Sequence, residues 1–371
     1  MQPVSTLISR IKIMCGLGIY GQTLAPVLLR ELHDVIQSCA NTFLWLDEQN
    51  SITNIYDESP EVAVYIPKYF KKYHYKEEGC LKYIFDELIQ KRTGIITDKR
   101  ILTKYFYCSR FYNEVFRPMS YHHSALVGIK DNNRNIGVLA LNRCERDGDF
   151  STNETRILMD LTPYIASGMN CSTGNNTAEF VDSEESGLIV LNLQGNIKYI
   201  SPRGRMLLFL ATHPTISAKT ICDYHIDSFI KTDVTIPGAV MQLCSQLLVL
   251  VENVNDTLTP LIWSHSNLWG GFTFGIYWLK NTNSQDNSLI GITIKQQIPL
   301  SLKLLRRLTM LSLTPKQIQI AMQLIAGQTY NEIANHLQIS THTVIDHVRK
   351  LQEKFNVHNR SELVTALLTK I

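Results

Sequence analysis

A series of helix-start signals between residues 313 and 371 constrains the fold more than any other feature of this 371-residue chain. Three capping residues are each followed three places later by Gln or Glu, so that side chains and backbone can satisfy each other's donors: Thr314 with Gln317, Thr329 with Glu332, and Asn359 with Glu362. Ser340 offers a weaker cap with Thr343 in the third place, and Pro315 suits a first helical position. Gly327 is placed to end the first helix in the left-handed conformation. The segment is therefore predicted to form four short helices.

The second and third of these helices, Tyr330 to Leu337 and Thr341 onward, are separated by a tight turn, as in a helix-turn-helix. Apolar residues at helical spacing predict a small core beneath them: Ile320, Leu324, Ile333, Ala334, Leu337, Val344, Val348 and Leu351. On the third helix, Val344, Val348, Leu351 and Phe355 form one stripe. The opposite face is expected to point away from the core, and it carries His342, Ile345, Asp346, Arg349 and Lys350.

Charge is unevenly distributed along the chain. The whole sequence has 36 Lys and Arg against 33 Asp and Glu, a net charge of +3. Residues 300–371 hold nine of the cations and four of the acids, so this segment carries +5 and the rest carries −2. A basic C-terminal segment on a nearly neutral body predicts a polyanion as its partner.

The composition argues against several classes of protein. With 44% hydrophobic residues the chain can bury sizeable cores, and its length predicts two or three domains. Eight cysteines are scattered without a C-x-x-C pair, which indicates reduced thiols and no zinc site. Neither an apolar run of about 18 residues nor an N-terminal export signal is found, so a cytoplasmic protein that does not enter a membrane is expected.

The region before residue 170 has the pattern of an α+β domain. PVLLRELHDVIQSC at 26–39 predicts a helix, FLWLDE at 43–48 a strand, and SALVGIK and IGVLALNRC two strands around a turn of Asp and Asn. FSTNETRILMDLTPYIASGM then places Ser151 or Thr152 before an acidic first turn and an apolar stripe, which predicts a capped amphipathic helix. We expect an antiparallel sheet with helices on one side.

A second sheet is predicted after the small, polar stretch CSTGNNTAE at 171–179, which is typical of a linker. GLIVLNLQGNIKYIS predicts two strands around a Gln-Gly-Asn turn, and FTFGIYWLK and IGITIK predict two more. NTNSQDNS at 281–288 is interpreted as a hairpin loop inside this domain. After Pro299 the strand pattern changes to a helical one in LKLLRRL.

The segment 313–370 resembles the LuxR-type helix-turn-helix DNA-binding domain. LTP-K-Q, G-x-T-Y-N-E-I-A, L-x-I-S-x-H-T-V-x-D-H-V and K-F-N-V-x-N-R-S-E-L-V fall at the family's spacing without a gap. It departs from the family at Gln317 and Gln319, where acids are usual, and at Ile345, where Lys or Arg is usual. FYNEVFRPMSYHHSALVGIK, IGVLALNRCERDGDFSTNET and LTPYIASGM resemble a GAF-like sensor domain, and GLIVLNLQGNIKYIS resembles a PAS-like domain.

These resemblances imply α+β sensor domains, antiparallel sheets with flanking helices, followed by an all-α four-helix helix-turn-helix domain. The expected division is a GAF-like sensor domain at 20–170, a PAS-like domain at 180–297, a linker helix at 298–312 and a LuxR-type domain at 313–371. The implied function is a transcriptional regulator that binds double-stranded DNA in the major groove as a homodimer, under control of the sensor domains. The resemblance also admits a small-molecule effector in those domains and RNA polymerase as a further partner.

The LuxR resemblance assigns roles to individual side chains. Ile345, Asp346 and Arg349 would face base edges, with Arg349 donating to guanine, Asp346 accepting from cytosine and Ile345 lying against a thymine methyl. Phosphate contacts would come from Ser340, Thr341, His342, Thr343, Lys350 and Arg360. The fourth helix would pair two copies on half-sites about one helical turn apart, through Leu363, Ala366 and Leu367.

Other side chains invite a functional interpretation that their surroundings do not support. His122 and His123 have no Cys, Asp or His partner at metal-ligand spacing, which favours ordinary strand-edge histidines. Trp263, Trp269 and Trp278 would line a cofactor cavity or fill a core, and the core is the commoner case.

No nucleophile with a base, metal-ligand cluster or phosphate loop is found, so no catalytic residue, metal or cofactor is assigned and no enzymatic activity is expected. Two alternatives stay open at this point. One is a nucleotide-processing enzyme in the N-terminal domain. The other is a protein-interaction adaptor with a degenerate helix-turn-helix, which is motivated by the missing cation at Ile345.

Overall fold

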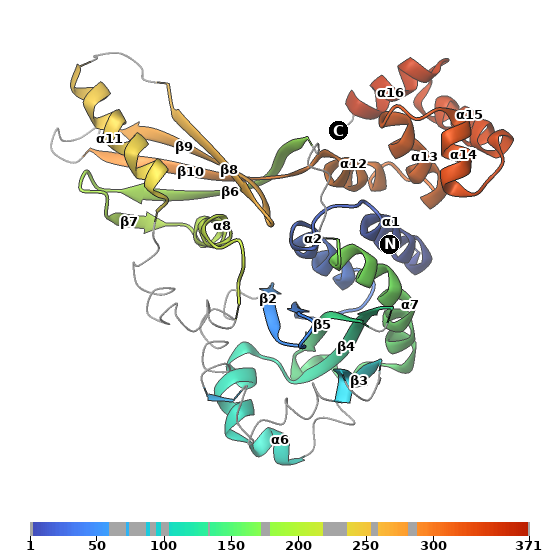
Figure 1. Ribbon diagram of the computed structural model, residues 1–371, viewed down its shortest axis with the longest axis horizontal. Coiled ribbons are helices and arrows are strands. Elements are labelled where there is room, and N and C mark those ends of the chain that lie inside the picture. Colours follow the sequence, from blue (N-terminus) through green and yellow to red (C-terminus); the bar gives the residue numbers. More distant parts are fainter. Residues whose placement is uncertain are drawn as a thin grey trace.

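The computed structural model describes residues 3–58, 72–73, 87–89, 94–97, 104–132, 134–171, 179–217, 236–253, 259–280 and 288–369. Two five-stranded antiparallel sheets are followed by a cluster of helices (Figure 1). This confirms the predicted fold class. The predicted linker at 171–179 and loop at 281–288 lie almost entirely outside the described residues, and the domain boundaries stay predictions. None of the described helices has the length and apolar character needed to cross a membrane.

The first sheet has the strand order β2-β1-β5-β4-β3. Its strands are β1 (Ala40–Leu46), β2 (Ile52–Asp57), β3 (Ile95–Thr97), β4 (His123–Asp131) and β5 (Arg134–Arg143). The predicted hairpin of β4 and β5 is confirmed, as is the capped helix after it, α7 (Thr152–Met169). Ser151 caps α7 in a reciprocal arrangement with Glu154.

Both faces of the first sheet are covered. Helices α1 (Val4–Cys15), α2 (Gly21–His33) and α7 pack on one face, in one core with Phe43, Val127 and Leu139. The other face carries an aromatic cluster from α6 (Lys104–Cys108) and the short turns Tyr112–Phe116 and Arg117–Met119. The prediction of helices on one side only was therefore wrong, and α1 was not predicted at all.

The second sheet repeats that order as β7-β6-β10-β9-β8. Its strands are β6 (Phe180–Leu191), β7 (Ile197–Ile200), β8 (Leu261–Asn267), β9 (Gly270–Leu279) and β10 (Leu289–Pro299). Helices α8 (Pro202–Thr212) and α11 (Gly238–Asn253) both contact the sheet, and α11 crosses in front of its strands in Figure 1. The predicted turn between β6 and β7 is confirmed, with Gly195 at a φ of 82°.

Trp269 joins the two sheets. It lies in the turn between β8 and β9, is completely buried, and its indole Nε1 donates to the carbonyl of His213 at 2.9 Å. Its ring lies 6.1 Å from that of Trp45 on β1 and 5.8 Å from that of Tyr56 on β2. Trp263 and Trp278 are partly buried against the same core, as favoured from the sequence.

The C-terminal part is entirely helical. Helix α12 (Leu300–Thr309) begins at the residue after β10 and leads into α13 (Pro315–Ile325), α14 (Tyr330–Leu337), α15 (Thr341–Phe355) and α16 (Arg360–Thr369). Helix α13 packs against α1 and α12, so the helical cluster contacts the first sheet's layer of helices (Figure 1).

Candidate nucleic-acid interface

Capping side chains begin the helices of the C-terminal cluster where the sequence predicts. The Thr314 N–H donates to Gln317 Oε1 at 2.9 Å, and the Gln317 N–H donates back to Thr314 Oγ1 at 3.3 Å. Thr329 and Glu332 repeat this exchange at 2.7 and 3.3 Å. At α16 the Glu362 carboxylate accepts from the His358 N–H at 2.8 Å, one residue before the predicted partner Asn359.

Left-handed residues end the helices. Gly327 follows α13 at a φ of 84°, as predicted. Gln338 and Asn356 end α14 and α15 at a φ of 53° each, a role that the sequence analysis missed. Asn tolerates this conformation well, whereas Gln gives no such signal. The tight turn at Gln338 and Ile339 sets the angle at which α15 leaves α14.

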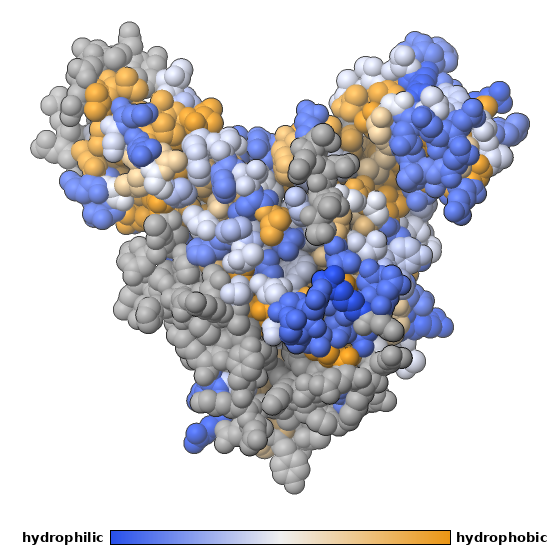
Figure 2. All heavy atoms as spheres, viewed as in Figure 1, coloured by the Kyte–Doolittle hydropathy of each residue, from blue (hydrophilic) through white to orange (hydrophobic). Residues whose placement is uncertain are grey.

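Helix α15 has one buried and one exposed face. Val344, Val348 and Leu351 are at most 3% exposed, and Phe355 is half-buried against the same core. Ser340 caps the helix by accepting from the Thr343 N–H at 3.0 Å. The stripe predicted from the sequence therefore anchors α15, and the opposite face is turned outward. Figure 2 shows hydrophilic side chains gathered over α14 and α15.

The three residues predicted to contact bases lie together on that outer face. Arg349 is exposed over 69% of its side chain and Asp346 over 45%, while Ile345 is half-buried between them and the core. Asp346 lies 3.3 Å from His342 Nδ1 and 4.0 Å from Arg349 Nη1. Asp346 therefore contacts two basic side chains of the same helix face, and neither contact is buried.

The residues predicted to contact phosphates divide into two groups. His342 and Lys350 are exposed. The others already bond within the chain: Ser340 Oγ bonds Thr343 Oγ1 at 2.8 Å, Thr341 Oγ1 donates to Asn331 Oδ1 at 3.0 Å, and Arg360 Nη2 donates to the Gln328 carbonyl at 2.6 Å. Arg360 also lies over the Tyr330 ring at 5.6 Å. Arg360 thus ties the start of α16 to the start of α14.

Pairing of two copies through α16 remains a prediction, but two of the three residues expected to make the contact are buried within this chain. Leu363 and Leu367 are completely buried in the core of this chain, where they hold α16 against α13 and α15. Ala366 is half-buried, and Leu368 is 43% exposed. A second copy that approached α16 would therefore contact Leu368 and Ala366 before either buried leucine.

His347 was not singled out by the sequence analysis. It is half-buried on α15, where burial first, and then the neighbouring Lys350 and Lys316, lower its pKa. A lowered pKa keeps the ring uncharged at neutral pH. His347 therefore adds no positive charge to the outer face.

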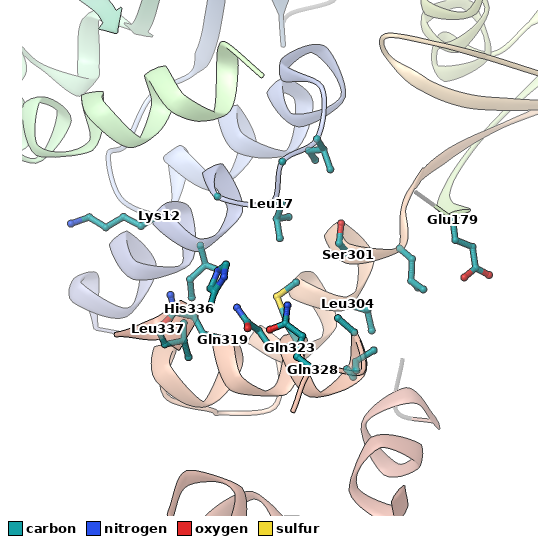
Figure 3. Close-up of a pocket in the computed structure, with 18 residues that line it drawn as sticks. Lys12, Leu17, Glu179, Ser301, Leu304, Gln319, Gln323, Gln328, His336 and Leu337 are labelled. Carbon is teal, nitrogen blue, oxygen red and sulfur yellow. The ribbon is translucent and has the colours of Figure 1, made fainter. Parts of the chain in front are cut away.

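A cleft of about 670 Å³ lies where α13 meets α1 and α12 (Figure 3). Its walls include Lys12 and Leu17 from the first region, Leu304 from α12, and Gln319 and Gln323 from α13. The side-chain oxygens of Gln323 and of Gln328 are buried and have no hydrogen-bond partner among the described residues. Gln319, one of the departures from the family pattern, thus lies in the contact between the two parts of the molecule.

Comparison with known proteins identifies the helical cluster. Residues 311–367 match the family described as bacterial regulatory proteins, luxR family. No curated protein matches the chain.

Several solved structures are similar over larger parts of the chain. The Vibrio cholerae VqmA dimer, a LuxR-type receptor, has 15% sequence identity, covers 51% of this chain and 84% of its own, and has a TM-score of 0.19. The phage VqmA–DPO complex has 16% identity, covers 51% and 85%, and has a TM-score of 0.19. The E. coli DhaR(N)–DhaL complex has 11% identity, covers 79% and 90%, and has a TM-score of 0.23.

Proposed function

Since residues 311–367 form a LuxR-family domain, we propose that the chain is a transcriptional regulator that binds specific DNA sequences through α15 and is controlled by its two sheet domains. The observation that carries the proposal is the two-faced geometry of α15. Its apolar stripe is buried, its N-terminus is capped, and its outer face presents Asp346 and Arg349 to solvent.

The outer face of α15 matches the chemistry of a major groove. Arg349 can donate two hydrogen bonds to guanine, which contributes about 1–3 kcal/mol of discrimination, and Asp346 can accept from the amino group of cytosine. Arg349 Nη1 lies 4.0 Å from Asp346 Oδ1, so the two side chains could contact the same base pair or neighbouring base pairs. Ile345 offers only an apolar contact, which suits a thymine methyl.

Phosphate contacts would come from the rim of the same helix. His342 and Lys350 are exposed there, and the N-terminus of α15 adds its backbone N–H groups and its dipole. Ser340, Thr341, Thr343 and Arg360 can reach a phosphate only while keeping or exchanging their internal hydrogen bonds. We therefore expect Lys350 to contribute more to phosphate binding than Arg360.

Control by the sheet domains would act on the placement of α15 and not on its exposure. The helical cluster packs against α1 and α12 through α13, and the outer face of α15 stays open. A cytoplasmic signal, such as a small-molecule effector, would shift an equilibrium between arrangements of these contacts. The cleft lies in that contact, and among the described residues the side-chain oxygens of Gln323 and Gln328 on its wall have no hydrogen-bond partner. Opening of the cleft would let two copies adopt the spacing of two half-sites. RNA polymerase is a further proposed partner of the bound dimer.

Selection of bound fragments from a random pool of duplex DNA tests the proposal. We expect one enriched motif, with binding that weakens steeply as salt rises, because cations on the protein release counterions from the duplex. Arg349→Ala should relax the motif at one position, and Lys350→Ala should weaken all sequences alike. Arg146→Ala, which removes a side chain 87% exposed in the first region, is the matched control and should change neither.

A pool without an enriched motif would overturn the proposal and favour an adaptor. Ile345→Lys restores the charge that the family usually carries at this position. Under the proposed function it should tighten binding and shift the preferred base away from thymine.

A further inference from the structure

The second sheet has one buried face and one open face. Residues that point to the helices α8 and α11 are at most 1% exposed: Ile189, Leu191, Phe272, Phe274, Ile276, Ile290, Ile292 and Ile294. In the part of the chain that the structure describes, no helix covers the opposite face. That face nevertheless carries five large apolar side chains that are 39–70% exposed: Leu188, Tyr199, Ile262, Tyr277 and Leu279.

The strand register places these five side chains on one continuous surface, the open face. Leu188 pairs with Thr293, Thr293 with Gly275, and Gly275 with Ile262, which makes one row across four strands. Tyr199 pairs with Val190, Val190 with Gly291, and Gly291 with Tyr277, which makes the next row. Directly paired residues point to the same side of a sheet. The open face is thus an ordered surface and not a scatter of exposed residues.

Two glycines on the open face lie close to the larger side chains of neighbouring residues. A Cβ atom on Gly275 would lie 3.1 Å from the ring of Tyr277, and one on Gly291 would lie 3.0 Å from Leu279 Cδ1. The side chains of Tyr277 and Leu279 therefore occupy the space next to Gly275 and Gly291. An exposed apolar sheet face is the kind of surface that packs about 10 Å from another sheet.

We propose that the open face of the second sheet is the interface through which two copies of this chain form a dimer. The five side chains together expose on the order of 600 Å², near the largest apolar patch of a typical monomer and most of the roughly 800 Å² per partner in a standard interface. The proposal rests on the proposed function only for its expectation that two copies act together.

The charges around the open face favour an identical partner. The two rows that hold Leu188, Ile262, Tyr199 and Tyr277 contain no charged residue among those that the structure describes. Lys295 lies one row away on the same face, where it pairs with Asp182 at 3.6 Å. A partner of strong charge therefore finds nothing to match here. A second copy, related by a two-fold axis, brings the same uncharged apolar surface, as an isologous interface requires.

The position of the open face connects it with DNA binding. Strand β10 lies in the middle of the second sheet, and α12 begins at the residue after it. Two sheets packed through their open faces would therefore fix the starting points of both α12 helices. The spacing of the two helical clusters would follow from this interface and not from α16 alone.

Sedimentation velocity on the full chain tests the interface. We expect the wild type to be a dimer and Ile262→Lys to raise the dissociation constant of the dimer by about 100-fold, because a central apolar contact is replaced by a charge. Ile262 is 65% exposed in one copy, so the fold should tolerate the change. Tyr199→Lys, at a position 70% exposed, is a second variant with the same expected result.

Two matched controls make the result specific. Val249→Lys alters a residue that is 59% exposed on α11, on the other side of the sheet, and Leu368→Lys alters α16. Val249→Lys should leave the dimer unchanged, and Leu368→Lys should weaken it by less than Ile262→Lys. A monomeric wild type, or a dimer that is insensitive to both Ile262→Lys and Tyr199→Lys, would overturn the inference.

The DNA pool separates failure of this inference from failure of the proposed function. Ile262→Lys should still enrich a single half-site, while it loses the fixed spacing between two half-sites. The wild type could be a dimer that enriches no motif, while Ile262→Lys dissociates as expected. In that case the dimer interface stands and the DNA-binding function does not. If the spacing persists in Ile262→Lys, the copies pair elsewhere and the inference is wrong.

Discussion

The two sheets have the same strand order and differ in what covers their second faces. In the first sheet, Val138 on the second face is completely buried beneath an aromatic cluster that includes Phe106 and Phe111. In the second sheet, Ile262 and Tyr199 on the corresponding side are 65% and 70% exposed. Sheets of the same strand order are thus covered on both faces in the first region and on one face in the second.

The strand sequences predict which of the two sheets is covered on both faces. Strands β4 and β5 contain the runs ALVGI and IGVLAL, which are apolar on both sides, as expected of strands buried on two faces. Strand β9 reads GGFTFGIYWL, in which Phe272, Phe274 and Ile276 alternate with small or partly exposed residues. Alternation of this kind is typical of a sheet with one face open. A continuous apolar run therefore predicts a second covering layer, and alternation predicts a free face.

The largest expected effect tests whether the second face of the first sheet is a core. Phe106 is 1% exposed, and its ring lies 5.5 Å from that of Tyr112 and 5.9 Å from that of Phe111. Phe106→Ala should lower the free energy of unfolding by about 3–5 kcal/mol, because it leaves a cavity. Ile262→Ala on the open face should change it by less than about 0.5 kcal/mol. Urea unfolding of dilute, monomeric chain measures both, and equal losses would contradict the comparison.

A smaller effect is expected at the junction of the two sheets. Trp269→Phe keeps an aromatic ring beside Trp45 and Tyr56 but removes the indole N–H that donates to the His213 carbonyl. Loss of one intramolecular hydrogen bond costs about 0.5–1.5 kcal/mol. We expect the urea transitions of the two sheets to separate, since this residue belongs to both cores. Trp263→Phe, which alters a partly buried ring, is the control and should leave the transitions together.

The sequence predicted elements whose causes are local. The caps at Thr314, Thr329 and Ser340 and the stripe on α15 depend on residues within a few places of one another, and the structure confirms them. The sequence did not predict that Leu363 and Leu367 are buried, because a stripe on a helix does not tell which neighbour covers it. Helix α1 and the role of Trp269 were missed for the same reason, since their contacts are far away in the chain.

The caps of the two covering helices allow a finer comparison. Ser201 Oγ accepts from the Gly204 N–H on α8 and from the Leu188 N–H on β6, both at 3.0 Å, so it ties the helix to the sheet. The Ser151 side chain bonds to Glu154 of its own helix, α7. Ser201→Ala should therefore destabilise the chain by about 2 kcal/mol and Ser151→Ala by about 1 kcal/mol. Thermal unfolding followed by calorimetry measures the loss of stability in each variant. A larger loss in Ser151→Ala than in Ser201→Ala would contradict the proposed link between α8 and β6.

The smallest expected effect is a pH dependence that belongs to the first sheet. Burial raises the pKa of Glu154, but hydrogen bonds from Arg143 and Ser151 outweigh it and the pKa is lowered overall. A carboxyl whose folded pKa lies below its unfolded pKa stabilises the fold above the unfolded value, and this contribution is lost as pH falls through the folded pKa. Glu154→Gln keeps an acceptor for Arg143 but does not titrate. The melting temperature of the chain should therefore fall less between about pH 5 and pH 3 in Glu154→Gln than in the wild type. An identical acid dependence in both proteins would show that the Arg143–Glu154 ion pair contributes nothing to the closed sheet's stability.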